Sequence, residues 1–216
     1  CHTAQDDDRH AKPAEPAEKA TPGVAVELNQ LGKTPDGLTR RNLPWGKRVS
    51  TLFLDKVLWI EKDLGLCADN LMNCMAFETG RTFSPKVKNP GSSATGLIQF
   101  MEATARRLGT TTAALSQMTA ENQLNFVWKY FNDYADRMNL KDWDLGDTYM
   151  AILWPAGIGK TGDYPIFVQG RGNTYAANRG LDVNRDGTVT RDECISKIVA
   201  MAKEGLAAGN YGYGSL

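Results

Sequence analysis

Glu78 is the residue whose type and position best suit acid–base chemistry. Leu71, Met75 and Glu78 follow one another at i, i+4 and i+7, so on a helix the carboxyl group continues an apolar stripe. Gly80 predicts that this helix ends just after Glu78. Burial among apolar side chains would raise the pKa of the carboxyl group, and a protonated carboxyl can donate a proton to a leaving oxygen. The alternative is a solvated glutamate at a helix end.

The segment after Gly80 is rich in turn-forming residues. Ser84-Pro85 and Asn89-Pro90-Gly91 predict turns, and the apolar run Gly96–Phe100 follows them. We therefore expect a hairpin or loop that folds back beside the end of the Glu78 helix. The amide of Gln99 lies between apolar residues, where an unpaired polar group is costly. A ligand that carries hydroxyls or amides could satisfy it, and so could the backbone of the loop itself.

Two sequence pieces carry a resemblance to a known superfamily. Glu-Thr-Gly at 78–80, followed by Ser-Ala-Thr-Gly-Leu-Ile-Gln-Phe at 93–100, resembles the signature of the lysozyme-like soluble lytic transglycosylases. The residues of these motifs most closely resemble those of phage-type muramidases and of peptidoglycan-cleaving effectors of type VI secretion, and the resemblance covers residues 48 to 160. The resemblance implies that Glu78 is the general acid and that Gln99 lines a sugar groove. It also implies a mainly α fold of lysozyme-like α+β type, with a small β-hairpin or loop beside the catalytic helix.

A third motif of these enzymes is only partly present. Lytic transglycosylases carry Ala-Tyr-Asn-Ala-Gly after a helix, with a tyrosine that contacts the acid. Here Trp154-Pro155 stands in place of Tyr-Asn before Ala156-Gly157. Tyr149, more than one helical turn earlier, is the nearest candidate for the missing hydroxyl, so we include Tyr149 and Trp154 among the expected substrate-binding residues.

The second catalytic group is open. A two-carboxylate glycosidase needs another Asp or Glu across the bond, and residues 82–100 contain none. The nearest candidates in sequence are Glu61, Glu102 and Asp147. Otherwise, polar groups place a water for inverting hydrolysis, or the 6-hydroxyl of MurNAc attacks and an anhydro product forms. We expect the first of these two, which makes the chain a muramidase that cleaves the β-1,4 MurNAc–GlcNAc bond. The polar groups that could place the water are Ser93, Thr95 and Gln99.

Residues 182–193 match a calcium-binding EF-hand loop at every position. Oxygen ligands fall at positions 1, 3, 5, 7 and 12, Gly187 supplies the turn at position 6, and Val189 is the apolar residue at position 8. A single loop, with Arg185 and Arg191 reducing its charge, predicts a structural Ca²⁺ site rather than a sensor. The expected ligands are Asp182, Asn184, Asp186, Thr188 and Glu193.

Composition limits the other possibilities. Lys plus Arg and Asp plus Glu number 25 each, so the chain has no excess of positive charge that would favour nucleic acid as a binding partner. No apolar run approaches the roughly 18–20 residues of a membrane span. Both histidines, His2 and His10, lie in the polar segment 1–25, which excludes His-dependent nucleophiles and a His-ligated zinc from the rest of the chain. Cys67 and Cys74 are interpreted as small buried side chains, with a disulfide as the alternative.

We divide the chain into a disordered tail (1–25), a transitional segment (26–47), a lysozyme-like domain (48–207) and a frayed end (208–216). Because the chain does not begin with Met, we expect a piece of a longer protein, with a lipid anchor at Cys1 as the alternative. Helices are expected over 49–64, 69–78, 101–108, 111–118, 120–138, 145–153 and 190–204.

We expect a monomer that acts on peptidoglycan glycan strands, is secreted or delivered to a target-cell periplasm, and is matched by an immunity protein. A non-catalytic, calcium-stabilised peptidoglycan-binding module is the alternative from a different class.

Overall fold

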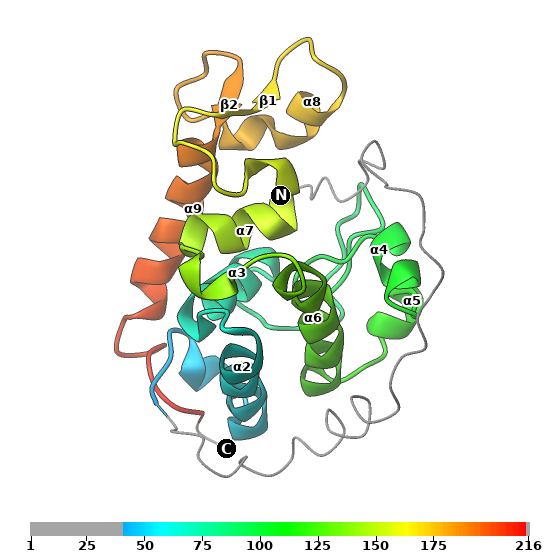
Figure 1. Cartoon of the computed structure of the whole chain (residues 1–216), viewed down its shortest axis with the longest axis vertical. Helices are drawn as coiled ribbons and strands as arrows, with labels where there is room; N and C mark the ends of the chain where they lie inside the picture. The colour runs from blue at the N-terminus through cyan, green and yellow to red at the C-terminus, as the bar shows by residue number, and fades with distance from the viewer. Residues whose placement is uncertain (1–40, 215–216) are drawn as a thin grey trace.

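The computed structural model describes residues 41–214. Helices dominate this part of the chain, and a small antiparallel sheet of two strands lies at one end (Figure 1). The α-helices are α2 (Thr51–Leu64), α3 (Ala68–Glu78), α4 (Glu102–Arg107), α5 (Thr112–Leu115), α6 (Ala120–Ala135), α7 (Leu145–Leu153), α8 (Thr174–Asn178) and α9 (Arg191–Gly205). The strands are β1 (Pro165–Val168) and β2 (Thr188–Thr190), and short 3-10 turns are η2 (Gly46–Arg48), η3 (Leu140–Asp142), η4 (Pro155–Gly157) and η5 (Arg179–Leu181).

Helix α3 lies at the centre of the molecule and contacts α2, α7 and α9 (Figure 1). Eight of its eleven residues are buried, and these include Glu78. Since such a helix has almost no solvent-facing side, its position depends on packing against its neighbours rather than on its own amphipathic pattern. The end of α3 is therefore a rigid place to hold a functional side chain.

The helix boundaries expected from the sequence are largely confirmed. Helix α7 has the expected bounds, Leu145–Leu153, and Ser50, Thr119 and Thr190 each accept an N-cap hydrogen bond from the backbone. Helix α3 begins at Ala68, earlier than expected, with Cys67 at the N-cap. Helix α6 ends at Ala135, earlier than the expected 138, and Met138 beyond it is exposed.

The expected frayed end was wrong for residues 208–214. Leu43 and Gly212 exchange backbone hydrogen bonds of 3.0 and 3.2 Å, and the Lys47 amide donates to the carbonyl of Asn210. Trp45, in the segment expected to be transitional, is fully buried against Gly205. The two stretches are short in apolar residues, but each satisfies the backbone groups of the other, which a single-segment pattern does not predict. The expectations for residues 1–40 lie outside the described residues.

The small sheet lies beside the predicted calcium loop, not beside α3. Phe167 of β1 pairs with Val189 of β2, and Val168 pairs with Thr188. The segment after α3, expected to form a hairpin or loop, is a loop with isolated bridges between Lys88 and Thr95 and between Thr95 and Phe100. Among the helices of residues 41–214, none is long and apolar enough to cross a membrane.

Candidate active site and calcium loop

Glu78 is the last residue of α3 and its side chain is almost fully buried, with 7% of the residue exposed. Its Oε1 atom is buried without a hydrogen-bond partner among the described residues. Burial raises the pKa of Glu78 from the ordinary 4.5 to about 7, because the charged form loses its hydration. At neutral pH a large share of this carboxyl group therefore carries a proton, and its Oε1 atom is both buried and unpaired.

The titratable side chains next to Glu78 remain neutral. Burial, and then the neighbouring Glu78, raise the pKa of the Cys74 thiol and of the Tyr149 phenol well above their ordinary values. Tyr149 lies on α7 and is fully buried, and its ring meets that of Phe77 edge to face. Since neither neighbour is ionised near neutral pH, neither adds a negative charge beside Glu78, and burial accounts for its raised pKa. Tyr149, expected from the sequence to lie near the acid, is therefore placed in its electrostatic neighbourhood.

A well-defined helix stop fixes the position of Glu78. The Gly80 amide donates to the carbonyl of Phe77, and the Arg81 amide donates to the carbonyl of Ala76, which is the Schellman pattern of a helix C-terminus. Gly80 and Arg81 both have left-handed backbone conformations, with φ of 58° and 72°. The chain thus turns away within two residues of Glu78.

Two buried amides hold the Gly96–Phe100 turn. The Nε2 atom of Gln99 donates to the carbonyls of Gly96 (3.0 Å) and Val87 (3.3 Å). Gln123 of α6, fully buried, accepts from the Leu97 amide at 2.6 Å and donates to the carbonyl of Leu115 at 2.9 Å. The alternative in which loop backbone satisfies Gln99 is therefore present in the structure, while a contact of Gln99 with sugar stays a prediction.

Gln123 is a residue that the sequence analysis missed. Gly96, which lies against the Gln123 amide, has a φ of 82°. Any other residue at position 96 would clash, because its Cβ would lie 2.2 Å from Oε1 of Gln123. The available signal was a glutamine beside the apolar stripe of α6, next to Leu124. That signal is weak, because polar residues often border such stripes.

The other expected substrate-binding residues differ in exposure. Thr95 is buried and donates to the carbonyl of Ser93, whereas Ser93 is exposed and accepts from the Glu102 amide. Trp154 is partly buried at the end of α7 and packs edge to face on Phe167. Ser93 and Trp154 are thus the members of this set with solvent-accessible side chains.

All three candidates for a second carboxylate already have structural partners. Glu61 accepts from Arg41 and from the Ala68 amide. Glu102 accepts from the amide and the hydroxyl of Thr112, which lowers its pKa. Asp147 accepts from Arg191 and from the Gly159 amide. Each carboxylate is bound in place by contacts that maintain the fold, so none of these three is a good candidate for the catalytic partner of Glu78.

The backbone of the predicted calcium loop turns at position 6, where the EF-hand pattern has glycine. Gly187, at position 6, has a φ of 87°, and its amide donates to Oδ2 of Asp182 at 3.0 Å. The Asp186 amide donates to Asn184, and the Thr188 amide donates to Asp186. These short-range bonds turn the side-chain oxygens of positions 1, 3 and 5 towards the inside of the loop.

Glu193 connects the two ends of the loop. Its Oε1 accepts from the amides of Val183 and Asn184, and its Oε2 accepts from the amide and the hydroxyl of Thr190. The Thr190 and Glu193 bonds form a capping box that starts α9. The residue at position 12 is therefore both the candidate bidentate ligand and the N-terminal anchor of α9.

The residues of the loop fit a hard cation. Asp182 is 7% exposed, and its Oδ1 atom is buried without a hydrogen-bond partner among the described residues, while Oδ2 accepts from Tyr175. That hydrogen bond from Tyr175 lowers the pKa of Asp182, so the carboxyl group is ionised. A buried, ionised oxygen without a donor is costly unless a cation binds it.

A different group of possible ligand atoms has another explanation. Within residues 41–214, one set of three His, Cys, Asp or Glu ligand atoms lies within 4.8 Å of one another, and it consists of Glu61, Cys67 and Asp69. Arg41 forms ion pairs with both carboxylates, at 2.9 and 2.5 Å. The positive charge that this cluster needs is thus already present. Cys67, Cys74 and Cys194 are free cysteines.

Arg191, at position 10 of the loop, links it to the helix of Tyr149. Its guanidinium, with 8% of the side chain exposed, donates to Asp147 at 2.8 Å, to Asp144 at 3.3 Å and to the carbonyl of Gly157 at 3.2 Å. Asp144 is the N-cap of α7. The calcium loop and the Tyr149 helix are therefore joined through one buried cation.

Comparison with known proteins adds no relative: no protein-family model matches the chain, and no curated protein matches it.

Proposed function

We propose that this chain is a muramidase that cleaves the β-1,4 bond between MurNAc and GlcNAc, with Glu78 as the general acid. The observation that carries the proposal is the state of Glu78, a buried carboxyl group at a helix end with a pKa of about 7 and an unpaired oxygen. The sequence resemblance at 78–80 and 93–100 supplies the substrate class.

The proposed reaction begins with proton transfer from Glu78 to the glycosidic oxygen. Because a large share of the Glu78 carboxyl groups carries a proton at neutral pH, Glu78 can release this proton as the bond to the leaving sugar lengthens. The neutral phenol of Tyr149 and the thiol of Cys74 keep the surroundings free of charge, so the proton is not lost to a neighbouring base. The rigid end of α3 keeps the acid in one place during this step.

In the hydrolase, a water attacks the anomeric carbon after being placed by polar groups of the loop. Ser93 is the exposed hydroxyl of that set. The second candidate is a lytic transglycosylase, in which the 6-hydroxyl of MurNAc attacks and a 1,6-anhydro product forms. A specific observation favours it, namely that Glu61, Glu102 and Asp147 are all held by structural partners.

We further propose that the 182–193 loop binds Ca²⁺ through Asp182, Asn184, Asp186, the carbonyl of Thr188 and Glu193. When bound, the ion would neutralise the three carboxylates and connect the loop to the start of α9. The buried, unpaired oxygen of Asp182 supports this assignment. A calcium-rich compartment outside the cytosol suits a single loop of this kind.

The deciding experiment is mass spectrometry of purified peptidoglycan digested by the chain or by Glu78→Gln. Reducing-end muropeptides that vanish in the variant are the expected result, and anhydro-muropeptides would establish the lytic transglycosylase instead. Release of no soluble product by either protein would overturn the enzyme proposal. Sedimentation with intact cell walls would then test the remaining class, a non-catalytic peptidoglycan-binding module. An immunity protein and delivery to the periplasm follow only if lysis is observed.

A further inference from the structure

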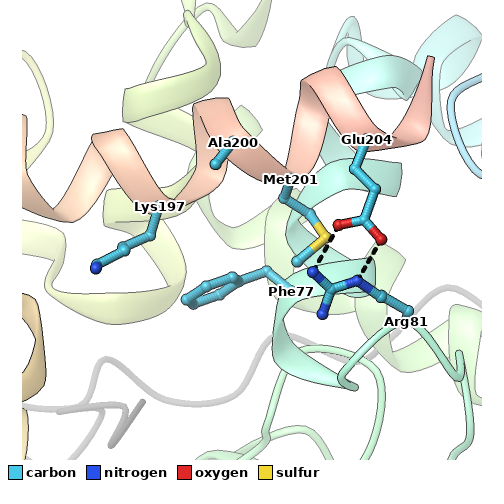
Figure 2. A pocket seen from close by; sticks show the side chains of 6 residues that line it. All are labelled: Phe77, Arg81, Lys197, Ala200, Met201 and Glu204. Atoms are coloured by element: carbon cyan, nitrogen blue, oxygen red, sulfur yellow. Dashed lines mark hydrogen bonds and ion pairs between the residues drawn. The ribbon is translucent and has the colours of Figure 1, made fainter. Parts of the chain in front are cut away.

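Helices α3 and α9 do not pack fully against each other beside Glu78. A pocket of about 300 Å³ separates them, lined by Phe77 and Arg81 from the end of α3 and by residues of α9 (Figure 2). The lining residues of α9 are Lys197, Ala200, Met201 and Glu204. Although the two helices contact each other elsewhere, the end of α3 is less closely packed on this side, so a polar contact across the pocket can help to fix its distance from α9.

A two-pronged ion pair spans this gap. Arg81 donates from Nε to one oxygen of Glu204 at 2.7 Å and from a terminal nitrogen to the other at 2.6 Å (Figure 2). This paired geometry fixes the direction as well as the distance between the two groups. Arg81 makes this contact from a left-handed backbone conformation, which glycine adopts at lower cost.

The partner helix α9 is held at both ends. Arg191 connects the first turn of α9 to α7. Near the other end of α9, the side-chain Nδ2 of Asn210 donates to the Glu204 carbonyl at 3.0 Å. The indole of Trp45 also packs against Gly205, the last residue of α9. The ion pair thus connects the end of α3 to a helix that is itself held at both ends.

We infer that Arg81 and Glu204 are positioning residues for Glu78, which hold the last turn of α3 so that the acid stays buried beside Tyr149. This inference depends on the acid role proposed for Glu78. Neither side chain needs to touch substrate, because Arg81 acts on the helix end three residues after Glu78. Cys74 on α3 and Tyr149 on α7 are the titratable neighbours of the acid, and the pair contacts neither of them through a described hydrogen bond.

An ordinary surface ion pair provides a matched control. The side chains of Arg81 and Glu204 are 48% and 41% exposed, and those of Arg107 and Asp133, also an ion pair, are 55% and 38% exposed. Pairs this exposed contribute little to stability. Arg81→Gly also relieves the left-handed conformation, so we expect its Tm to stay close to that of the parent chain, as for Arg107→Ala.

The test compares Arg81→Gly, Glu204→Gln, the double variant and Arg107→Ala by amide hydrogen exchange and by the pH dependence of muropeptide release. We expect faster exchange over residues 76–83 in the first three proteins and not in the control. Since water then reaches Glu78, its pKa should fall and the alkaline limb of activity should move to lower pH. A shift of one unit would reduce activity at pH 7 about fivefold.

The double variant should behave like each single variant, because both substitutions break the same contact. Unchanged exchange over 76–83 together with an unchanged alkaline limb would overturn the inference while leaving the proposed activity intact. If the parent chain releases no muropeptides, the acid role has failed, and the exchange data still decide whether the pair holds the helix end.

Discussion

The rings of Phe77 and Tyr149 meet edge to face, with centroids 5.6 Å apart and planes at 83°. The contact joins the residue before Glu78 to the helix α7, so it fixes the Tyr149 ring relative to the acid. Aromatic pairs in this geometry add roughly 0.5–1.5 kcal/mol beyond their buried area. The phenol oxygen can therefore be removed without changing the position of the ring.

Tyr149→Phe should reduce turnover at least about tenfold, in the range seen when one hydrogen-bond donor is removed from an active site. We expect the Tm to fall no further than in Tyr130→Phe, because the ring and its packing are retained. Steady-state muropeptide release and thermal unfolding check the two statements. Tyr130→Phe is the control, since its hydroxyl donates to the Ala151 carbonyl in the core and should affect stability alone. Full activity of Tyr149→Phe would remove Tyr149 from the proposed site.

Glu78→Gln should change the pH dependence of stability. The folded state raises the pKa of Glu78 from 4.5 to about 7, so it binds more protons than the unfolded state between these values. Stability therefore falls as pH rises through this window, by about 3 kcal/mol in total, and then stays level. Urea unfolding should find the variant near the parent chain at pH 4 and more stable at pH 8.

The control for that experiment has the opposite sign. Hydrogen bonds from Thr112 lower the pKa of Glu102 in the folded state, so this residue stabilises the protein above its unfolded pKa and stops doing so in acid. Glu102→Gln should therefore destabilise the protein at pH 8. Equal effects of the two substitutions at pH 8 would contradict the assigned burial of Glu78.

Calcium should stabilise the chain through Asp182. At a free calcium concentration one hundred times the Kd, binding to the folded state alone adds about 2.7 kcal/mol. Asp182→Asn should lose most of this increment, measured as the rise in Tm when calcium is added to chelator-treated protein. Asp192→Asn, an exposed neighbour at position 11 of the loop, should keep it. A calcium-independent Tm in the parent chain would rule out the site.

Arg191→Met should destabilise the protein by about 3 kcal/mol, because the carboxylate of Asp147, with 14% of its side chain exposed, then has no cation beside it. Arg107→Ala removes an exposed ion pair and should cost no more than about 1 kcal/mol. Chemical denaturation of both variants measures the difference. Equal losses would show that Arg191 contributes no more than a surface charge.

The sequence predicted the burial of Glu78 and the end of its helix well, because the apolar spacing before Glu78 and the glycine after it are local signals. The same holds for α7, whose cap at Asp144 and apolar run mark both ends. For Gln99 the local sequence left two partners open, a ligand or the loop backbone, and in the structure its amide donates to backbone carbonyls of the loop. Local signals did not predict that Gln123, from a helix more than twenty residues later in the chain, would accept a hydrogen bond from the Leu97 amide of this loop.

Helix α9 shows the limit of pattern reading. Ile195, Ile198, Val199 and Ala202 are spaced like the apolar face of a helix, but Val199 is 39% exposed, and the buried positions after Arg191 are Cys194, Ile198, Met201 and Gly205. Both sets are spaced like a helix face. The rotation between them is decided by Gly205, which allows close approach of Trp45, and by the Arg191 contacts with α7.

The pairing of Leu43 with Gly212 brings the first and last described segments side by side. A domain whose two ends are adjacent can be inserted into a surface loop of a host protein without stretching either connection. The same adjacency allows circular permutation, with a short linker between the old ends and new ends in the exposed turn at 90–93. The fold can thus be inserted as one unit into a larger protein while both of its connections stay short.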